Sequence, residues 1–172
     1  MQNYELAKVF HKLFAGGEHG FGLIDKTKPS GYDFKHRAPT LEDFKDHLEG
    51  RISMGIVPIN RQGFAKFGSM DIDDHKNDKT KPVIPWSKEQ YQKLLDKIRF
   101  LKLPLKVFKS KSGGAHCHLF LDKFYKAKDV RHILSKFEYA LGYERDYLEK
   151  FPKQETLWVL NKKTGKWEPT AL

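Results

Sequence analysis

Residues 105–121, LKVFKSKSGGAHCHLFL, decide the expected fold. Two short apolar runs, 105–108 and 115–121, flank a turn rich in lysine, serine and glycine. Short apolar runs separated by a glycine-containing turn are typical of two antiparallel strands in a hairpin. The segment therefore predicts a β-hairpin, and the elements on either side of it fix the topology.

Extended and helical patterns alternate on both sides of this hairpin. Before it, FGSMDID at 67–73 predicts a strand, and a capping box at 87–90 predicts the start of a helix that runs to about Leu101. After it, KDVRHILSKFEYAL at 128–141 has the apolar spacing of a helix, and 157–160 predicts a last strand. The order of elements is β-α-β-β-α-β.

This order predicts an α+β fold with the RRM-like (ferredoxin-like) arrangement. The four strands of that arrangement form one sheet in the order 4-1-3-2. The strand at 67–73 would then lie in the centre, between the strands at 115–121 and 157–160. Sequence positions that are far apart thereby become neighbours.

The first 65 residues predict a smaller module that packs against this core. Its expected elements are helices at 4–14 and 40–49, a loop at 21–39 and a strand at 54–59. No repeat, low-complexity tract or flexible linker separates the two parts. We therefore expect a single domain over residues 1–172, with an N-terminal module at 1–65 and the RRM-like module at 66–172.

Composition narrows the class of partner. Lys and Arg outnumber Asp and Glu by 32 to 22, and residues 87–172 hold 19 of the basic but only 10 of the acidic residues. A basic half favours a polyanionic partner such as nucleic acid, although a well-solvated lysine-rich surface is the alternative. A single cysteine, Cys117, excludes an internal disulfide and a cysteine-rich zinc site. No apolar run approaches the ~20 residues of a membrane span, so we expect a cytoplasmic protein.

Two carboxylates lie on the predicted central strand. Asp71 and Asp73 are two residues apart, so their side chains project from one face of the sheet. Paired carboxylates repel each other unless a cation lies between them, and Mg²⁺ and Mn²⁺ prefer oxygen ligands. The pair predicts a divalent-metal site, and ordinary surface aspartates at a strand end are the alternative.

The hairpin turn has the residue types of an anion site. The glycines of SKSGG allow close approach of a phosphate, and the hydroxyl, lysine and His116 side chains can donate to it. An ordinary hairpin turn is the alternative. In the predicted sheet order, His116 and Asp71 lie on adjacent central strands, which brings the anion-type and metal-type sites together.

Four segments together resemble the archaeo-eukaryotic primase superfamily. SMDIDDH at 69–75 and VFKSKSGGAHCHLFL at 107–121 resemble its first two motifs, and EKFPKQETL at 149–157 is similar to the segment that bears its third acidic motif. The upstream FHKLFAGG, GYDFKHRAPT and GIVPIN resemble the N-terminal module of its small primase-polymerases from mobile elements, viruses and conflict systems. The resemblance covers most of the chain.

The resemblance implies template-dependent nucleotidyl transfer, as a DNA primase, a DNA polymerase or both, with two divalent ions, Mg²⁺ or Mn²⁺. It implies a single-stranded or primed DNA template and nucleoside triphosphates as partners. The metal ligands would be Asp71, Asp73 and Glu155, with Asp122 and Asp146 as weaker substitutes for Glu155. The triphosphate would be held by Ser110, Lys111, Ser112 and His116.

Two other functions stay open at this point. His116 and His118 fit the histidine motif of rolling-circle nucleases, with Tyr139, Tyr143 or Tyr147 as the nucleophile. That assignment leaves Asp71, Asp73 and the SKSGG turn without a role. A nonenzymatic RRM-like binding module would instead want exposed aromatic residues on its central strands.

The chain ends at Leu172, where the resemblance leads us to expect further sheet. This leaves open that the sequence is a module of a longer protein with a helicase or other domains. In a virus or plasmid, the expected location becomes the cytoplasm of the host cell.

Overall fold

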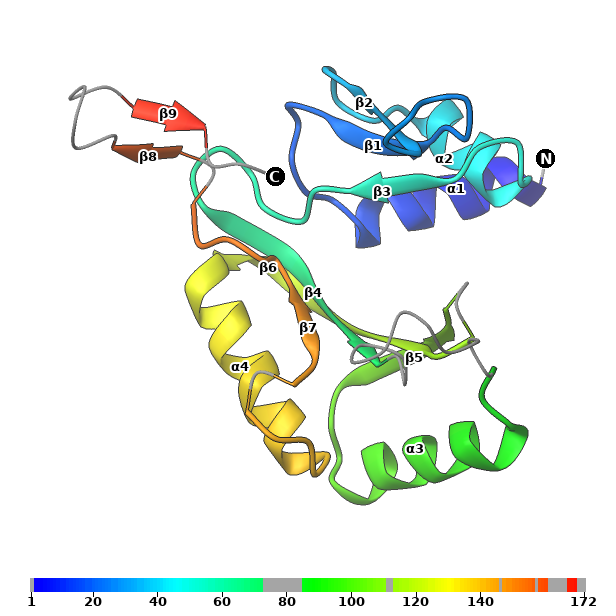
Figure 1. Cartoon of the computed structure of the whole chain (residues 1–172), viewed down its shortest axis with the longest axis vertical. Helices are drawn as coiled ribbons and strands as arrows, with labels where there is room; N and C mark the ends of the chain where they lie inside the picture. The colour runs from blue at the N-terminus through cyan, green and yellow to red at the C-terminus, as the bar shows by residue number, and fades with distance from the viewer. Residues whose placement is uncertain are drawn as a thin grey trace.

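The computed structural model describes residues 2–72, 85–110, 113–145, 147–156, 158–160 and 167–169. Figure 1 shows two layered parts joined by β4, with a short hairpin at one side. The helices are Gln2–Leu13 (α1), Leu41–Leu48 (α2), Lys88–Phe100 (α3) and Ala127–Ala140 (α4). The strands are Phe21–Ile24 (β1), Tyr32–Lys35 (β2), Met54–Ile56 (β3), Phe64–Ile72 (β4), Leu105–Lys109 (β5), Ala115–Lys126 (β6), Glu149–Phe151 (β7), Trp158–Leu160 (β8) and Trp167–Pro169 (β9).

The larger part contains a four-stranded antiparallel sheet in the order β5-β6-β4-β7. With α3 before β5 and α4 before β7, the element order and the sheet order are those predicted from the sequence, and the α+β class is confirmed. The identity of the last strand was predicted wrongly. β7 pairs with β4, whereas β8 pairs with β9 in a separate hairpin. The three-residue β7 is too short for its side-chain alternation to stand out in the sequence.

α3 and α4 cover one face of this sheet, which is called the helix face below (Figure 1). Met70 and Cys117 project from that face and are fully buried with Leu134 of α4. Gly68 allows α4 to approach β4 closely, because a Cβ atom there would lie 2.9 Å from Leu134 Cδ1. The alternation of small or apolar residues along β4 and β6 thus produces the core.

The N-terminal part contains the three-stranded sheet β2-β1-β3, with α1 and α2 packed together beside it. The predicted loop at 21–39 is wrong, since it contains β1 and β2. These four-residue strands lie among glycine, proline and charged residues, which masked their extended pattern. None of the described helices is long and apolar enough to cross a bilayer.

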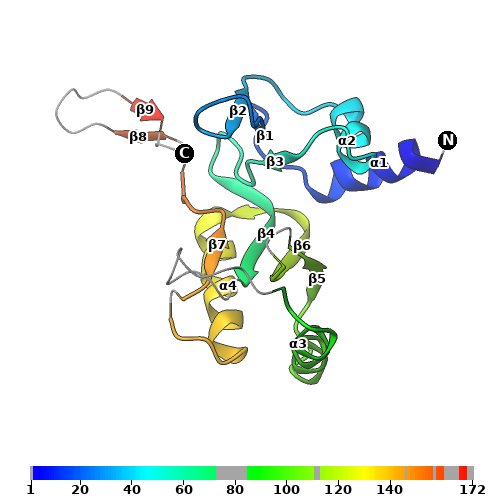
Figure 2. The same ribbon diagram turned by 45° about the vertical axis from the view of Figure 1, so that its right-hand side comes forward.

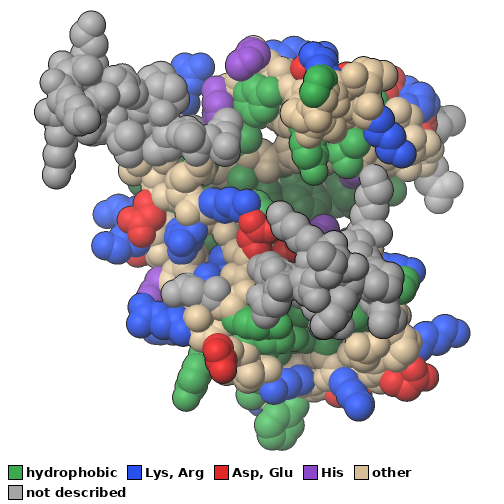
Figure 3. Space-filling view, viewed as in Figure 1, with side chains coloured by type: hydrophobic (Ala, Val, Ile, Leu, Met, Phe, Trp, Pro, Cys, Tyr) green, Lys and Arg blue, Asp and Glu red, His purple; other side chains and the backbone are tan. Residues whose placement is uncertain are grey.

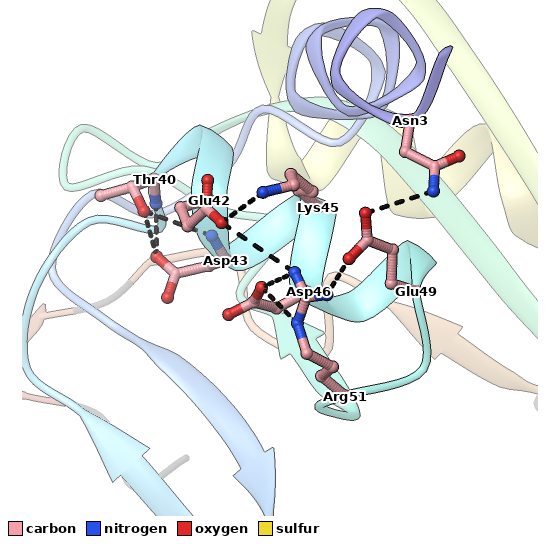
Figure 4. Close-up of polar contacts among 8 residues, drawn as sticks. All are labelled: Asn3, Thr40, Glu42, Asp43, Lys45, Asp46, Glu49 and Arg51. Carbon is pink, nitrogen blue, oxygen red and sulfur yellow. Dashed lines mark hydrogen bonds and ion pairs between the residues drawn. The ribbon is translucent and has the colours of Figure 1, made fainter. Parts of the chain in front are cut away.

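Polar contacts fix α2 (Figure 4). The Thr40 hydroxyl accepts from the Asp43 amide at 3.3 Å, and the Asp43 carboxylate accepts from the Thr40 amide at 2.6 Å, which forms a capping box. Beyond the helix, Arg51 pairs with Asp46 and Glu49. Asn3 of α1 donates to Glu49, so the two helices are linked by polar contacts as well as by packing.

The N-terminal part lies against the other face of the four-stranded sheet, the open face, on the side away from α3 and α4 (Figures 1 and 2). Phe14, directly after α1, packs its ring edgewise on Phe67 and Phe120, with centroids 5.1 Å away in each case. It also contacts the His118 ring at 5.2 Å. This aromatic contact covers one end of the open face and leaves the end near Asp71 accessible.

Candidate active site

The strand register places four side chains, two of them carboxylates, in one row across the open face. Asp71 on β4 lies opposite His116 on β6 and opposite Glu149 on β7, and His116 in turn lies opposite Phe108 on β5. Directly opposed residues of antiparallel strands have Cβ atoms about 4.5–5.5 Å apart. Figure 3 shows the molecule hollowed between this face and the N-terminal part, with hydrophobic side chains inside the hollow.

Asp71 and His116 form the centre of the row. The distance between Asp71 Oδ1 and His116 Nε2 is 3.4 Å. The His116 side chain is 40% exposed, whereas that of Asp71 is 18% exposed and its Oδ1 atom is buried. The two central strands therefore bring together the residues that the sequence assigned to the metal-type and anion-type sites.

Glu149 adds a second carboxylate beside Asp71. Its side chain is 36% exposed and forms an ion pair with Lys153. Two opposed carboxylates favour a cation between them, and their oxygen atoms suit Mg²⁺ or Mn²⁺, so this pair fits a divalent ion. No cluster of three or more metal-binding side chains occurs among the described residues, and Asp73 lies outside them.

The turn beside the row is held by its own backbone and by α3. The Ser110 amide donates to the Gly114 carbonyl at 2.9 Å, and Ser110 is buried. Gly113 has a φ of +93°, and a Cβ atom there would lie 2.7 Å from Pro85 Cα. A side chain at this position would therefore require both strain and displacement. Lys111 and Ser112 lie outside the described residues.

Two donors, one just before α3 and one in its first turn, contact the carbonyls of this turn. The Tyr91 hydroxyl lies 3.0 Å from the Gly113 oxygen and 2.7 Å from the Gly114 oxygen. The Trp86 amide donates to the Gly113 carbonyl at 2.9 Å. These contacts hold the peptide groups of Gly113 and Gly114 in a defined orientation.

The other predicted acidic residues lie elsewhere. The Glu155 carbonyl oxygen is 3.1 Å from a Cβ built on Gly63, just before β4, whereas Asp71 is at the opposite end of that strand, about 23 Å from Phe64. Asp122 is about 20 Å along β6 from His116 and accepts a hydrogen bond from Tyr125. The structure brings neither residue to Asp71. Asp146 lies outside the described residues.

The sequence analysis did not select Glu149 as a candidate, although it lies two residues before the FPKQ segment at 151–154. The available signal was the position of this residue at the start of EKF, next to that segment. The register of the sheet was needed to show that Glu149, and not Glu155, lies opposite Asp71.

Burial changes the acid–base chemistry of the two residues after His116. The pKa of Cys117 is raised to about 12, first by burial and then by the charge of Asp71. The pKa of His118 is lowered to about 4, first by burial and then by the neighbouring His116. Nδ1 of His118 is buried and has no hydrogen-bond partner among the described residues. At neutral pH, His118 is therefore an uncharged member of the aromatic cluster.

The tyrosines do not approach the histidines. Tyr139 is on α4, which covers the helix face, and its side chain is 79% exposed. Tyr143 packs against the core cluster on that same face, and its ring stacks on Tyr147 at 5.8 Å. His116 and His118 project from the open face, so the sheet separates the two sets of residues.

Comparison with known proteins identifies the family of the chain. No curated protein matches the sequence. The family model described as "TOTE conflict system, Archaeo-Eukaryotic Primase domain" matches residues 9–164, which includes the row, the turn and most of the N-terminal part. This match extends over nearly the whole chain, and the chain belongs to the family of archaeo-eukaryotic primase domains of TOTE conflict systems.

Proposed function

We propose that this domain joins nucleotides on a DNA template, as a DNA primase, a DNA polymerase or both. Membership in the family supports nucleotidyl transfer of the primase-polymerase type. The observation that carries the proposal is the row of Glu149, Asp71 and His116 on three adjacent strands, beside a turn suited to phosphate. Carboxylates, an imidazole and a small-residue turn are the parts that a phosphoryl-transfer site requires.

The carboxylates of Asp71, Asp73 and Glu149 are the proposed metal ligands, with Glu149 in the role first assigned to Glu155. Glu149 is preferred because it lies opposite Asp71 in the register, whereas Glu155 follows β7 and lies near the start of β4. Mg²⁺ or Mn²⁺ bound there would stabilise the negative charge that develops on the transferred phosphoryl group.

His116 and the turn are the proposed triphosphate site. The ring of His116 is accessible, and an N–H group at Nε2 can donate to a phosphate oxygen. Ser110, Lys111 and Ser112 complete the segment, with the amide groups of a glycine-rich turn as further donors. Asp71 Oδ1 lies 3.4 Å from the same ring nitrogen, His116 Nε2.

The DNA template is the proposed partner of the basic second half of the chain. The N-terminal part supports the same function, since Phe14 joins it to the sheet and the hollow lies between them. We therefore treat residues 1–65 and 66–172 as two modules of one catalytic domain, acting in the cytoplasm of a cell or of an infected host. A helicase or further domains of a longer protein would supply unwound template.

A rolling-circle nuclease is disfavoured by the placement of its required residues. A tyrosine nucleophile must reach DNA held at the metal-binding histidines. Tyr139 and Tyr143 belong to the helix-face side, and His118 is largely buried among Phe14, Phe108 and other rings. Combined replacement of the three tyrosines by Phe should leave nucleotide incorporation intact.

A primer-extension assay tests the proposed function. The protein is incubated with a primed DNA template, labelled nucleoside triphosphates and Mg²⁺ or Mn²⁺, and the products are separated on a denaturing gel. Wild-type protein should extend the primer, and folded Asp71→Asn should not, because one metal-binding charge is lost. A covalent DNA–protein band with no nucleotide incorporation would contradict the proposal and favour the nuclease.

A further inference from the structure

The position of Glu149 depends on a strand that is too short to fix its own register. β7 has three residues, and among the strands that the structure describes it pairs only with β4, at the edge of the sheet. Side chains of a strand alternate between the two faces, so a slip of one residue would turn Glu149 to the helix face. Three ladder positions give little resistance to such a slip, and another element has to hold β7 in place.

Glu138 of α4 contacts the residues on both sides of Glu149. Its Oε1 atom accepts a hydrogen bond from the Leu148 amide at 2.6 Å, and its Oε2 atom lies 2.5 Å from Lys150 Nζ. The Glu138 side chain is fully buried, and that of Lys150 is 5% exposed. Lys150 lies opposite Met70 and therefore points to the helix face, while Glu149 points to the open face.

A second residue of the same helix holds the far end of β7. Arg131 Nη1 donates to the Pro152 carbonyl at 2.7 Å and also to the Lys153 carbonyl. Arg131 and Glu138 lie seven residues apart on α4, which is two helical turns, so both project on one side of the helix. The helix thus contacts the chain directly before, within and after the strand.

We propose that Glu138, together with Lys150, is a positioning residue that sets the register of β7 and so holds Glu149 opposite Asp71. This inference rests on the proposed function, because Glu149 is a metal ligand only if the proposed metal site exists. A slipped register would leave the Glu138 carboxylate and the Lys150 ammonium buried apart from each other, which is strongly unfavourable. The native register is the one that joins them. The pair selects one alignment of the strand even where its net effect on stability is small.

The test uses a variant that removes the pair without leaving a buried charge. Replacement of a buried ion pair by apolar residues of similar volume is often neutral for stability, but the Leu148 amide also loses its Glu138 acceptor, so Glu138→Leu/Lys150→Met should fold and unfold moderately below the wild-type temperature. Its Mn²⁺ affinity, measured by titration calorimetry of the full chain with Mn²⁺ alone, should fall about tenfold. Glu138→Gln keeps an oxygen for the Leu148 amide but leaves the buried Lys150 ammonium without its carboxylate, so it should lower the unfolding temperature and weaken Mn²⁺ binding at least as much as the double variant does.

Two controls separate positioning from general stability. Leu134→Ala removes packing between α4 and the sheet, so it should lower the unfolding temperature and leave Mn²⁺ affinity unchanged. Hydrogen exchange should accelerate at the amides of residues 148–151 in the double variant and stay constant in β4 and β6. If the double variant fails to fold, Mn²⁺ affinity and hydrogen exchange are measured on Glu138→Gln instead. The positioning role requires that any loss of Mn²⁺ affinity in this variant is accompanied by faster exchange at residues 148–151.

Wild-type Mn²⁺ affinity and unchanged exchange in the folded double variant would overturn the positioning role. Failure of the proposed function gives a different result, in which wild-type protein binds no Mn²⁺ or Asp71→Asn binds it equally well. The positioning role is supported when Asp71→Asn abolishes binding and the double variant weakens it.

Discussion

Removal of the Tyr91 hydroxyl tests whether the hairpin turn is a pre-organised triphosphate site. This hydroxyl lies within hydrogen-bond distance of two turn carbonyls, at 3.0 Å for Gly113 and 2.7 Å for Gly114. A typical intramolecular hydrogen bond contributes about 0.5–1.5 kcal/mol net, and one proton is shared between these two acceptors. Tyr91→Phe should therefore lower the free energy of unfolding by about 0.5–1.5 kcal/mol and leave the ring packing against Trp86 in place.

The same change should weaken nucleotide binding. In the variant, the turn samples more conformations before the ligand arrives, and binding has to restore the order that Tyr91 supplied. We expect the dissociation constant of a nucleoside triphosphate, measured by equilibrium titration, to rise about threefold to tenfold.

Tyr125→Phe is the matched control for this change. It removes a single hydroxyl that donates to Asp122, away from the turn, and should leave nucleotide affinity unchanged. A Tyr91→Phe variant that loses stability and keeps wild-type nucleotide affinity would refute the reasoning, because the turn would then be a structural hairpin only.

Two further predictions follow from the burial of residues next to His116. The pKa of His118 is about 4 in the folded protein and near 6.5 in the unfolded chain. Between these two pH values the unfolded chain binds a proton at His118 and the folded chain does not. The free energy of unfolding should therefore fall by up to about 3 kcal/mol as the pH drops from 6.5 to 4. Denaturant titrations across this range should show a shallower decline for His118→Phe, and parallel curves would contradict the assignment. The pKa of Cys117 is about 12, so the buried thiol stays protonated at pH 8. It should therefore react with a chromogenic disulfide reagent only as the protein unfolds. Rapid reaction of the native protein would contradict this prediction, because it would show that the core around β6 is open to the reagent.

The parts of the fold that could be predicted are those with several agreeing local signals. α3 has a capping box at Ser87 and Gln90 together with an amphipathic pattern, and the structure forms it over Lys88–Phe100. The central hairpin was predicted from two apolar runs and a glycine turn. In both cases local preference and burial favour the same structure.

The missed parts depend on contacts that no local pattern encodes. β1 and β2 have four residues each, and pairing with each other and with β3 stabilises them. β7 exists because it pairs with β4 and is held by Glu138, which lies 11 residues earlier in the chain. The candidate site likewise has one part that could be predicted from local sequence and one part that could not. Asp71 and His116 were predicted to be neighbours, whereas Glu149 required the actual register.

The most direct test of the central claim is primer extension by Glu149→Gln and Glu155→Gln in parallel. Both variants lose one acidic charge in the same short segment, so they differ chiefly in where the side chain lies. We predict that folded Glu149→Gln loses template-directed incorporation by about a hundredfold or more, as expected for a metal-binding carboxylate in phosphoryl transfer, whereas Glu155→Gln retains wild-type extension. Loss of extension in Glu155→Gln with wild-type extension in Glu149→Gln would contradict the row of Glu149, Asp71 and His116 as the active site.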